Sequence, residues 1–513
     1  MPDARMLAYK PKIFLEVNPP QLQQTGIQGI LSVFPRAEIH TDGGAGTAEG
    51  DAGISIEVKT DGAGLNITGR ILRQGDLIEL SDCDREIGQG NYAPWQWEQR
   101  RQERVKGMVQ QLLTAGFGVE EPPWGILVGV RPTKMVHRYL DQGLSEARIE
   151  ELLRDVYRMR FDKIELLMQV VHSQRRFFTP ESRRRVSIYV GIPFCPTRCH
   201  YCSFAAYPLG THGHLVEGFF AALLQEVESL GHWLTSLGIQ ADTWYIGGGT
   251  PTILTADQLE LLLERMRSCL PHPQFREFTV EAGRADTITA EKLQVMRKYA
   301  VNRLSINPQS MQQRTLDAVG RRHTVEQVIS AFALARDAGF ETINADLILG
   351  LPGEKPEDVT DTLAKIRELN PENLTVHTLA VKRAATWRHQ AEELAYPTPE
   401  EMEIMAELTK EYALAQGLLP YYLYRQRYTV GDLENIGYAK PGTESGYNVF
   451  MMEERQSIIA LGGGGITKFV YPDETVVRVI NPKCSATYAQ NLGKLLEEKK
   501  AALTKWCKEG LNC

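Results

Sequence analysis

Three cysteines within eight residues carry the strongest chemical signal in this sequence. Cys195, Cys199 and Cys202 have the spacing Cys-x3-Cys-x2-Cys and follow an apolar, β-branched run that predicts a strand. Three thiolates on one short loop can hold three irons of a four-iron, four-sulfur cube and leave the fourth iron open. An iron with an open position can bind a ligand and reduce it, so the spacing predicts a reactive cluster and not an electron relay.

Two alternatives stay open for the same residues. A structural zinc ion needs four ligands, and His200 follows Cys199 directly and could supply the fourth. Zinc sites usually combine two Cys-x2-Cys knuckles, however, and the sequence has no second one. The three cysteines could also be buried apolar residues that stand together by chance.

A glycine-rich turn is the second chemical signal. Gly247, Gly248 and Gly249 come at the end of another predicted strand and are followed by Thr250. Glycines at a strand end let a ligand approach the backbone closely, although a tight turn would also require them. We favour the ligand interpretation because the cysteine loop ends the preceding strand.

Both motifs belong to a regular alternation of strands and helices. Apolar, β-rich runs separated by helical patterns occur at residues 187–192, 243–248, 277–282, 301–307, 342–350 and 374–380. The alternation predicts an α/β fold whose parallel sheet has right-handed crossovers. Six units fall short of the eight in a closed barrel, so we expect an open, partial (β/α)6 TIM-like barrel. The cysteine loop then lies at the carboxyl ends of the strands, where such sheets carry their chemistry.

Further segments flank this core, which we place at residues 181–380. We expect a strand-rich α+β N-terminal domain at 1–95, a helical segment at 96–180 and a mostly helical C-terminal domain at 381–513. The glycine-rich stretch at 42–53 is not followed by Lys-Ser/Thr. It therefore predicts a flexible connector and not a phosphate-binding loop.

Composition and charge narrow the class of protein. The 513 residues are 43% hydrophobic and 24% charged, which is typical of a folded globular protein. The net charge of -7 gives no general footprint for nucleic acid. The first residues lack the apolar centre of a signal peptide, and no apolar run is long enough to span a bilayer. Because the other five cysteines are scattered, we expect a reducing, cytoplasmic location.

In order and spacing, the motifs resemble the radical SAM superfamily, and more closely its oxygen-independent coproporphyrinogen III oxidase-like family. The similar segments are YVGIPFC, GGGTPT, TVEA, NRLSINPQS, GRRHT and NADLILGLPGE, and the resemblance covers roughly residues 186–470. WGILVGVRPTK, at residues 124–134, looks like the coproporphyrinogen dehydrogenase (HemZ-type) branch of that family.

The resemblance implies a [4Fe–4S] cluster on the three cysteines and one or two molecules of S-adenosylmethionine (SAM). Reductive cleavage of SAM would yield a 5′-deoxyadenosyl radical, beside a cluster that the protein shields from water and oxygen. The cofactor-contacting positions implied by the family are Tyr189, Tyr201, Gly248, Gly249, Thr250, Glu281, Gln309, Arg321, Asp346, Ala380 and Ile466. A buried Asp346 needs a partner, which Arg321 could be, unless Arg321 instead grips a ligand carboxylate.

Two positions depart from the family pattern. Well-known members have histidine where this chain has Gly191, and a fourth cysteine where it has Phe204. Three-point ligation does not need that cysteine. The missing histidine puts full equivalence of activity in doubt.

The resemblance implies a tetrapyrrole substrate, coproporphyrinogen III, decarboxylated to protoporphyrinogen IX in haem biosynthesis. Its propionates would need cations at the barrel mouth, for which Lys382, Arg383, Arg425 and Arg427 are candidates. The implied partner is an electron donor such as flavodoxin or ferredoxin. Two other functions stay open, a haem-binding chaperone and a radical SAM enzyme that acts on another tetrapyrrole such as haem.

Overall fold

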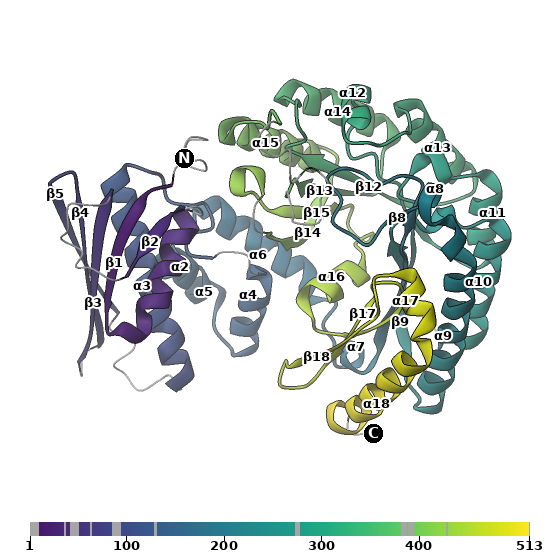
Figure 1. Cartoon of the computed structure of the whole chain (residues 1–513), viewed down its shortest axis with the longest axis horizontal. Coiled ribbons are helices and arrows are strands. Elements are labelled where there is room, and N and C mark those ends of the chain that lie inside the picture. The colour runs from purple at the N-terminus through teal and green to yellow at the C-terminus, as the bar shows by residue number, and fades with distance from the viewer. Residues whose placement is uncertain are drawn as a thin grey trace. The chain divides into compact units, whose positions relative to one another are not determined.

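The computed structural model describes residues 10–34, 37–41, 51–61, 64–84, 94–127, 131–271, 277–380, 387, 394–426 and 429–511. It divides the chain into two compact units (Figure 1). Unit 1 is Met1–Met168 with Thr398–Glu400, and unit 2 is Gln169–Pro397 with Glu401–Cys513. The finer boundaries expected near residues 95, 180 and 380 stay a prediction.

Unit 1 contains the expected strand-rich region. Its sheet has the order β2-β1-β3-β4-β5, from β1 (Lys12–Asn18), β2 (Glu38–His40), β3 (Ala52–Asp61), β4 (Gly64–Arg73) and β5 (Asp76–Asp84). The alternating strands bury Ile54 and Ile67 against α2 (Gln23–Val33) and α3 (Pro94–Phe117). Of the predicted glycine-rich connector, residues 42–50 lie outside the described part of the chain.

Helices fill the next segment, as expected. They are α4 (Pro132–Asp141), α5 (Glu146–Asp155), α6 (Phe161–Arg175) and α7 (Pro180–Arg184). Ser145 caps α5, since its side chain accepts a hydrogen bond from the backbone N–H of Arg148.

The six predicted strands of unit 2 are confirmed, all parallel and adjacent in chain order. They are β6 (Val186–Ile192), β9 (Ala241–Gly248), β10 (Glu277–Glu281), β11 (Arg303–Ser305), β12 (Thr342–Leu349) and β13 (Asn373–Thr378). Helices cross between them and cover one side of the sheet (Figure 1), namely α9 (Val216–Ser236), α10 (Ala256–Cys269), α11 (Ala290–Lys298), α13 (Val325–Asp337) and α14 (Pro356–Leu369). Short elements between these are α8 (Leu209–His212) and α12 (Gln313–Ala318).

The C-terminal region is helical, as predicted, and it also extends the sheet at both edges. Its helices are α15 (Pro399–Ala415), α16 (Gly446–Glu453), α17 (Ser485–Gln490) and α18 (Leu492–Gly510). At the β13 edge lie the antiparallel strands β15 (Asn435–Ala439) and β14 (Leu419–Tyr424). At the β6 edge lie β16 (Ser457–Gly462), which is parallel to β6, then β17 (Ile466–Val470) and β18 (Val476–Ile480).

One large apolar core joins the sheet of unit 2 to its helices. Trp244 and Phe278, on neighbouring strands, pack edge to face with their ring centroids 5.1 Å apart. In the described part of the chain, no helix combines the length and the apolar character that crossing a membrane requires.

Candidate active site at the carboxyl ends of the strands

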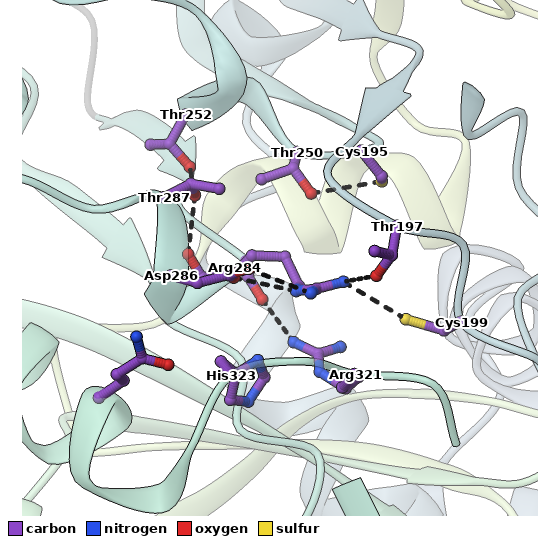
Figure 2. Close-up of polar contacts among 12 residues, drawn as sticks. Cys195, Thr197, Cys199, Thr250, Thr252, Arg284, Asp286, Thr287, Arg321 and His323 are labelled. Atoms are coloured by element: carbon purple, nitrogen blue, oxygen red, sulfur yellow. Dashed lines mark hydrogen bonds and ion pairs between the residues drawn. The ribbon is translucent and has the colours of Figure 1, made fainter. Parts of the chain in front are cut away.

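The cysteine loop and the glycine turn lie against each other where β6 and β9 end. The backbone N–H of Gly249 donates to the carbonyl of Ile192 (2.8 Å), and that of Thr250 donates to the carbonyl of Phe194 (2.7 Å). The thiol of Cys195 lies 3.3 Å from the Thr250 hydroxyl (Figure 2). Parallel strands β6 and β9 therefore deliver the two motifs to one place.

Two of the glycines are sterically required at this contact. Gly248 has a φ of +110°, which disfavours any residue with a side chain. A Cβ on Gly249 would lie 2.4 Å from the carbonyl oxygen of Phe194. The turn thus needs glycine to hold the cysteine loop, and its contact with a ligand stays a prediction.

The thiols of the loop are free and chemically suited to a cation. Cys195, Cys199 and Cys202 form no disulfide. Burial raises the pKa of Cys195 to about 11 and also raises the pKa of Cys202. Both therefore need a bound positive centre to become thiolates at neutral pH, which iron ions supply.

A single zinc ion suits the loop poorly. Within the described residues, no three His, Cys, Asp or Glu side chains lie close enough together to hold one metal ion. The His200 ring instead packs edge to face on Trp387, with the centroids 5.8 Å apart. A four-iron cluster does not require the three sulfur atoms to converge on one ion, because each thiolate binds a separate iron.

Half-buried side chains mark the accessible space beside the cysteine loop. In the carboxyl halves of β6, β9, β10, β12 and β13, where most residues are fully buried, Tyr189, Tyr245, Glu281, Asp346 and His377 are each partly accessible. The Tyr189 and Tyr245 rings stack at 6.2 Å, and both stack on Tyr447 of α16. The row therefore presents aromatic faces on one side and acids with a histidine on the other.

The Glu281 carboxyl of this row has a strongly perturbed pKa. Burial raises the pKa of its carboxyl to about 7, against the opposing effect of a hydrogen bond that the Tyr245 hydroxyl donates (2.5 Å). The nearby Asp346 carboxylate raises this pKa further. Near neutral pH, Glu281 can therefore either accept from a cationic group or carry a proton.

Asp346 and Arg321 do not pair with each other. The Asp346 carboxylate accepts from the Asn344 amide (2.7 Å) and lies 3.6 Å from Nε2 of His377. Arg321 is buried, and it donates to the Tyr201 hydroxyl (3.1 Å) and to the backbone carbonyls of Gly283 and Asn307. The ion pair between Arg321 and Asp346 that the sequence left open is therefore not formed.

Two buried polar atoms are left for a ligand to satisfy. Among the described residues, Oε1 of Gln309 and Nε of Arg321 have no hydrogen-bond partner. Gln309 has a φ of +69°, and its backbone bridges to β12 on both sides of Leu347. Such a strained position in a non-glycine residue is typical of functional sites.

The last two predicted positions lie at the edges of this region. Ala380 follows β13 and bridges to Thr429. Ile466 begins β17, directly after a glycine loop, and is 37% exposed. A Cβ on Gly463 of that loop would lie 2.5 Å from Pro193, so the loop packs on the start of the cysteine loop.

Sequence reasoning missed several residues of the site. Arg284 contacts Thr197 and Cys199, Tyr245 bonds to Glu281, and His377 lies beside Asp346. The available signals were a cation directly after a strand and polar residues within apolar strands. Their partners come from other strands and could not be read from local spacing.

Most of the cationic side chains predicted to bind the substrate lie outside the described residues. Lys382, Arg383 and Arg427 lie outside the described residues, and Arg425 is buried. A pocket of about 640 Å³ borders the cysteine loop, and its lining includes the exposed Arg198 and Arg322.

This chain is similar to a family of known proteins, to two relatives and to one solved structure. The family model described as "Radical SAM superfamily" matches residues 189–366. The oxygen-independent coproporphyrinogen-III oxidase-like protein HemZ of Bacillus subtilis (strain 168) is 41% identical over 80% of this chain and 83% of its own length. The heme chaperone HemW of the same organism is 33% identical over 53% of this chain and 68% of its own. The solved structure of coproporphyrinogen III oxidase (HemN) from Escherichia coli shares the fold at a TM-score of 0.50 and 22% identity, over 63% of this chain and 72% of that one.

Proposed function

We propose a function on the premise that this chain belongs to the radical SAM superfamily and, within it, to the oxygen-independent coproporphyrinogen-III oxidase-like proteins. The superfamily uses a [4Fe–4S] cluster and SAM. The proposed reaction is the oxygen-independent decarboxylation of coproporphyrinogen III to protoporphyrinogen IX. The observation that carries it is the cysteine loop seated beside the glycine turn and the half-buried row, in a chain 41% identical to HemZ.

The cluster ligands in this proposal are Cys195, Cys199 and Cys202. Three free thiols on one short loop support that role. No fourth cysteine is needed, because SAM fills the open position.

The SAM contacts are proposed from the matched positions and their surroundings. Gly248, Gly249 and Thr250 offer backbone groups and a hydroxyl, and Glu281 offers a carboxylate to a cationic group. The unsatisfied Gln309 Oε1 and Arg321 Nε support hydrogen bonds to the polar parts of SAM. Tyr189, Tyr201, Asp346, Ala380 and Ile466 complete the proposed set.

The bound cluster and SAM supply one-electron reduction and a radical able to remove a hydrogen atom. The chain's own part is to fix the substrate propionate near that radical and to exclude water from it. Each propionate would lose one hydrogen atom to the radical, carbon dioxide, and one electron to an external one-electron acceptor, and would so become a vinyl group. The stacked tyrosines Tyr189, Tyr245 and Tyr447 suit the pyrrole rings of a tetrapyrrole, because aromatic rings pack on one another.

We also propose an acidic electron carrier, such as flavodoxin or ferredoxin, as the partner. The exposed Arg198 and Arg322 at the pocket beside the cysteine loop support this choice, because opposite charge speeds the encounter of redox partners.

Anaerobic turnover by the reconstituted full-length chain tests the function. With coproporphyrinogen III, SAM and a reductant, we expect 5′-deoxyadenosine and protoporphyrinogen IX, the latter measured as protoporphyrin fluorescence after oxidation. The Cys199→Ser variant should form neither product, because one iron loses its thiolate. Cleavage of SAM without porphyrin product would reject this substrate, and no cleavage at all would reject the radical function.

A haem-binding chaperone is the second candidate, favoured by the 33% identity to HemW. Titration of the same protein with haem separates the two functions. Stoichiometric haem binding without porphyrinogen turnover would favour the chaperone. Loss of haem under turnover conditions would indicate radical chemistry on another tetrapyrrole.

A further inference from the structure

Arg284 is a buried cation beside the cysteine loop to which the proposed SAM site gives no role. It follows β10 and is only 3% exposed. Its Nη1 donates to the Thr197 hydroxyl at 3.1 Å and lies 3.9 Å from the sulfur of Cys199 (Figure 2). One edge of the guanidinium therefore faces the centre of the cysteine loop.

The remaining edge of the same guanidinium is fixed by Asp286. Nε and Nη2 donate to the two carboxylate oxygens at 3.2 and 3.3 Å. Such a two-point pair sets the plane of the guanidinium as well as its position. Arg284 is thus held in one orientation, with a hydrogen-bond donor directed at Thr197 and Cys199.

The fixed positive charge beside the cysteine loop comes from arginine side chains and not from the neighbouring histidine. Arg321 lies near Arg284, and it donates to the Tyr201 hydroxyl and to the backbone carbonyls of Gly283 and Asn307. His323 is buried, and its pKa is lowered to about 3 by burial and by both arginines. The imidazole is therefore neutral at physiological pH and adds no charge to the loop.

We propose that Arg284 is a positioning residue that raises the reduction potential of the cluster through Cys199. Reduction adds one electron from an external one-electron donor, takes the cluster from the 2+ to the 1+ state and makes or breaks no bond in the protein. A hydrogen bond to the cysteine sulfur and a buried positive charge both stabilise that added negative charge. Asp286 holds the guanidinium in place and partly offsets its charge.

This inference rests on the cluster and not on the porphyrin reaction. Its test is a redox titration of the anaerobically reconstituted full-length chain with dithionite, followed by the electron paramagnetic resonance signal of the reduced cluster. Arg284→Gln removes the charge, and we expect the reduced-to-oxidised ratio at a fixed potential to fall about tenfold, a shift of about 59 mV to more negative potential for one electron.

Two further variants test the direction in which the reduction potential shifts. Arg284→Lys keeps the charge and should stay closer to the parental potential than Arg284→Gln. Asp286→Asn removes the offsetting negative charge, while its amide oxygen can still accept from the guanidinium, so the potential should shift in the positive direction. Arg314→Gln is the matched control, because the Arg314 side chain is 64% exposed. Its exposed charge is screened by solvent, so the variant should keep the parental potential.

Parental potentials in Arg284→Gln and Asp286→Asn, at full iron content, would overturn the proposal. An equal shift in Arg314→Gln would also overturn it, because the charge of an exposed arginine would then suffice. If Arg284→Gln takes up no cluster, parental potentials in both Arg284→Lys and Asp286→Asn overturn it instead. A parental chain without a cluster rejects this proposal together with the radical function, whereas loss of porphyrin turnover alone affects only the substrate assignment.

Discussion

Gly191 shows how a single residue can make this chain differ from its relatives. It lies in β6 opposite Gly462 of β16, and a Cβ at residue 191 would stand 2.8 Å from the carbonyl oxygen of Gly463. The backbone N–H of Gly463 in turn donates to the carbonyl of Gly191 at 3.1 Å. The histidine of the best-known family members therefore has no room here, since a backbone oxygen occupies its place.

Substitution of Gly191 should consequently weaken the protein beside the cluster site. We expect Gly191→Ala to lower the free energy of unfolding by about 1–3 kcal/mol, because the added carbon forces backbone to shift. Chemical denaturation of the metal-free chain measures this. The control is Gly218→Ala in α9, where a Cβ meets nothing within 4 Å, so the change should raise the free energy of unfolding by roughly 0.5–1 kcal/mol. Equal stability of Gly191→Ala and the parent would contradict the steric argument.

Glu281 gives the site a pH dependence whose sign can be worked out. Burial gives its carboxyl a pKa of about 7 in the folded chain, above the ordinary value of 4.5 for a glutamate. Between these two values the folded state holds a proton that the unfolded state has released. The free energy of unfolding should therefore fall as pH rises from about 4.5 to about 7 and level off above that.

Denaturation of the metal-free chain at several pH values between 5 and 8 tests the Glu281 prediction. Glu281→Gln should flatten part of the slope. The remainder should include Glu354, whose pKa burial also raises to about 7, and Glu103, whose pKa burial raises as well. The exposed Glu264→Gln change on α10 removes the same charge and should leave the slope intact. A parental slope in Glu281→Gln would contradict the assignment.

The sequence predicted the site better where the two partner motifs each end one of two neighbouring parallel strands. The cysteine loop and the glycine turn could be placed together because parallel neighbours end at the same edge. Contacts that join distant segments could not be predicted. Arg284 reaches Thr197 across 87 residues, and His377 meets Tyr424 across 47.

At the scale of elements, the six central strands and the capping boxes of α10 and α13 were predictable from local pattern. β16 was not, because the glycine-rich segment around it predicts a turn. Ser457–Gly462 is nonetheless a fully buried strand parallel to β6. Only the long-range pairing with β6 makes that segment a strand, and its sequence carries no local signal for that pairing.

A buried polar network fastens the C-terminal helices to this added strand. The Lys499 ammonium of α18 lies 2.5 Å from the carboxylate of Glu226 on α9, and both side chains are almost completely buried. Glu226 also accepts from the Tyr488 hydroxyl (2.6 Å) and from the backbone N–H of Gly462 (2.7 Å). One carboxylate therefore joins α9, α17, α18 and the end of β16.

Removal of the Lys499 ammonium from this network should destabilise the folded chain. We expect Lys499→Met to lower the free energy of unfolding by about 3–5 kcal/mol, because it leaves Glu226 buried without its counter-charge. Glu226→Gln in the same chain should recover part of the loss. Lys494→Met, on the same helix but 80% exposed, serves as the control and should cost less than about 1 kcal/mol. Similar values for the two lysine variants would show that the pair does not stabilise the fold.

Each of the two units of the molecule has a large hydrophobic core of its own. Among the described residues, the core on the sheet of unit 1 runs from Ile13 to Val119, and the core on the sheet of unit 2 runs from Val186 to Cys507. All proposed cluster and SAM residues belong to unit 2. A unit that buries its own core can fold without the rest of the chain.

A truncated chain that begins at Phe161, and so keeps α6 whole, should therefore still form the cofactor site. We expect it to take up the same iron per chain as the full-length protein and to cleave SAM at a comparable rate. Iron analysis and 5′-deoxyadenosine formation with dithionite measure both. A folded truncated chain, shown by cooperative melting, that binds no cluster would contradict the independence of unit 2. If it cleaves SAM but no longer decarboxylates coproporphyrinogen III, unit 1 must serve the substrate, because the radical chemistry is intact without it.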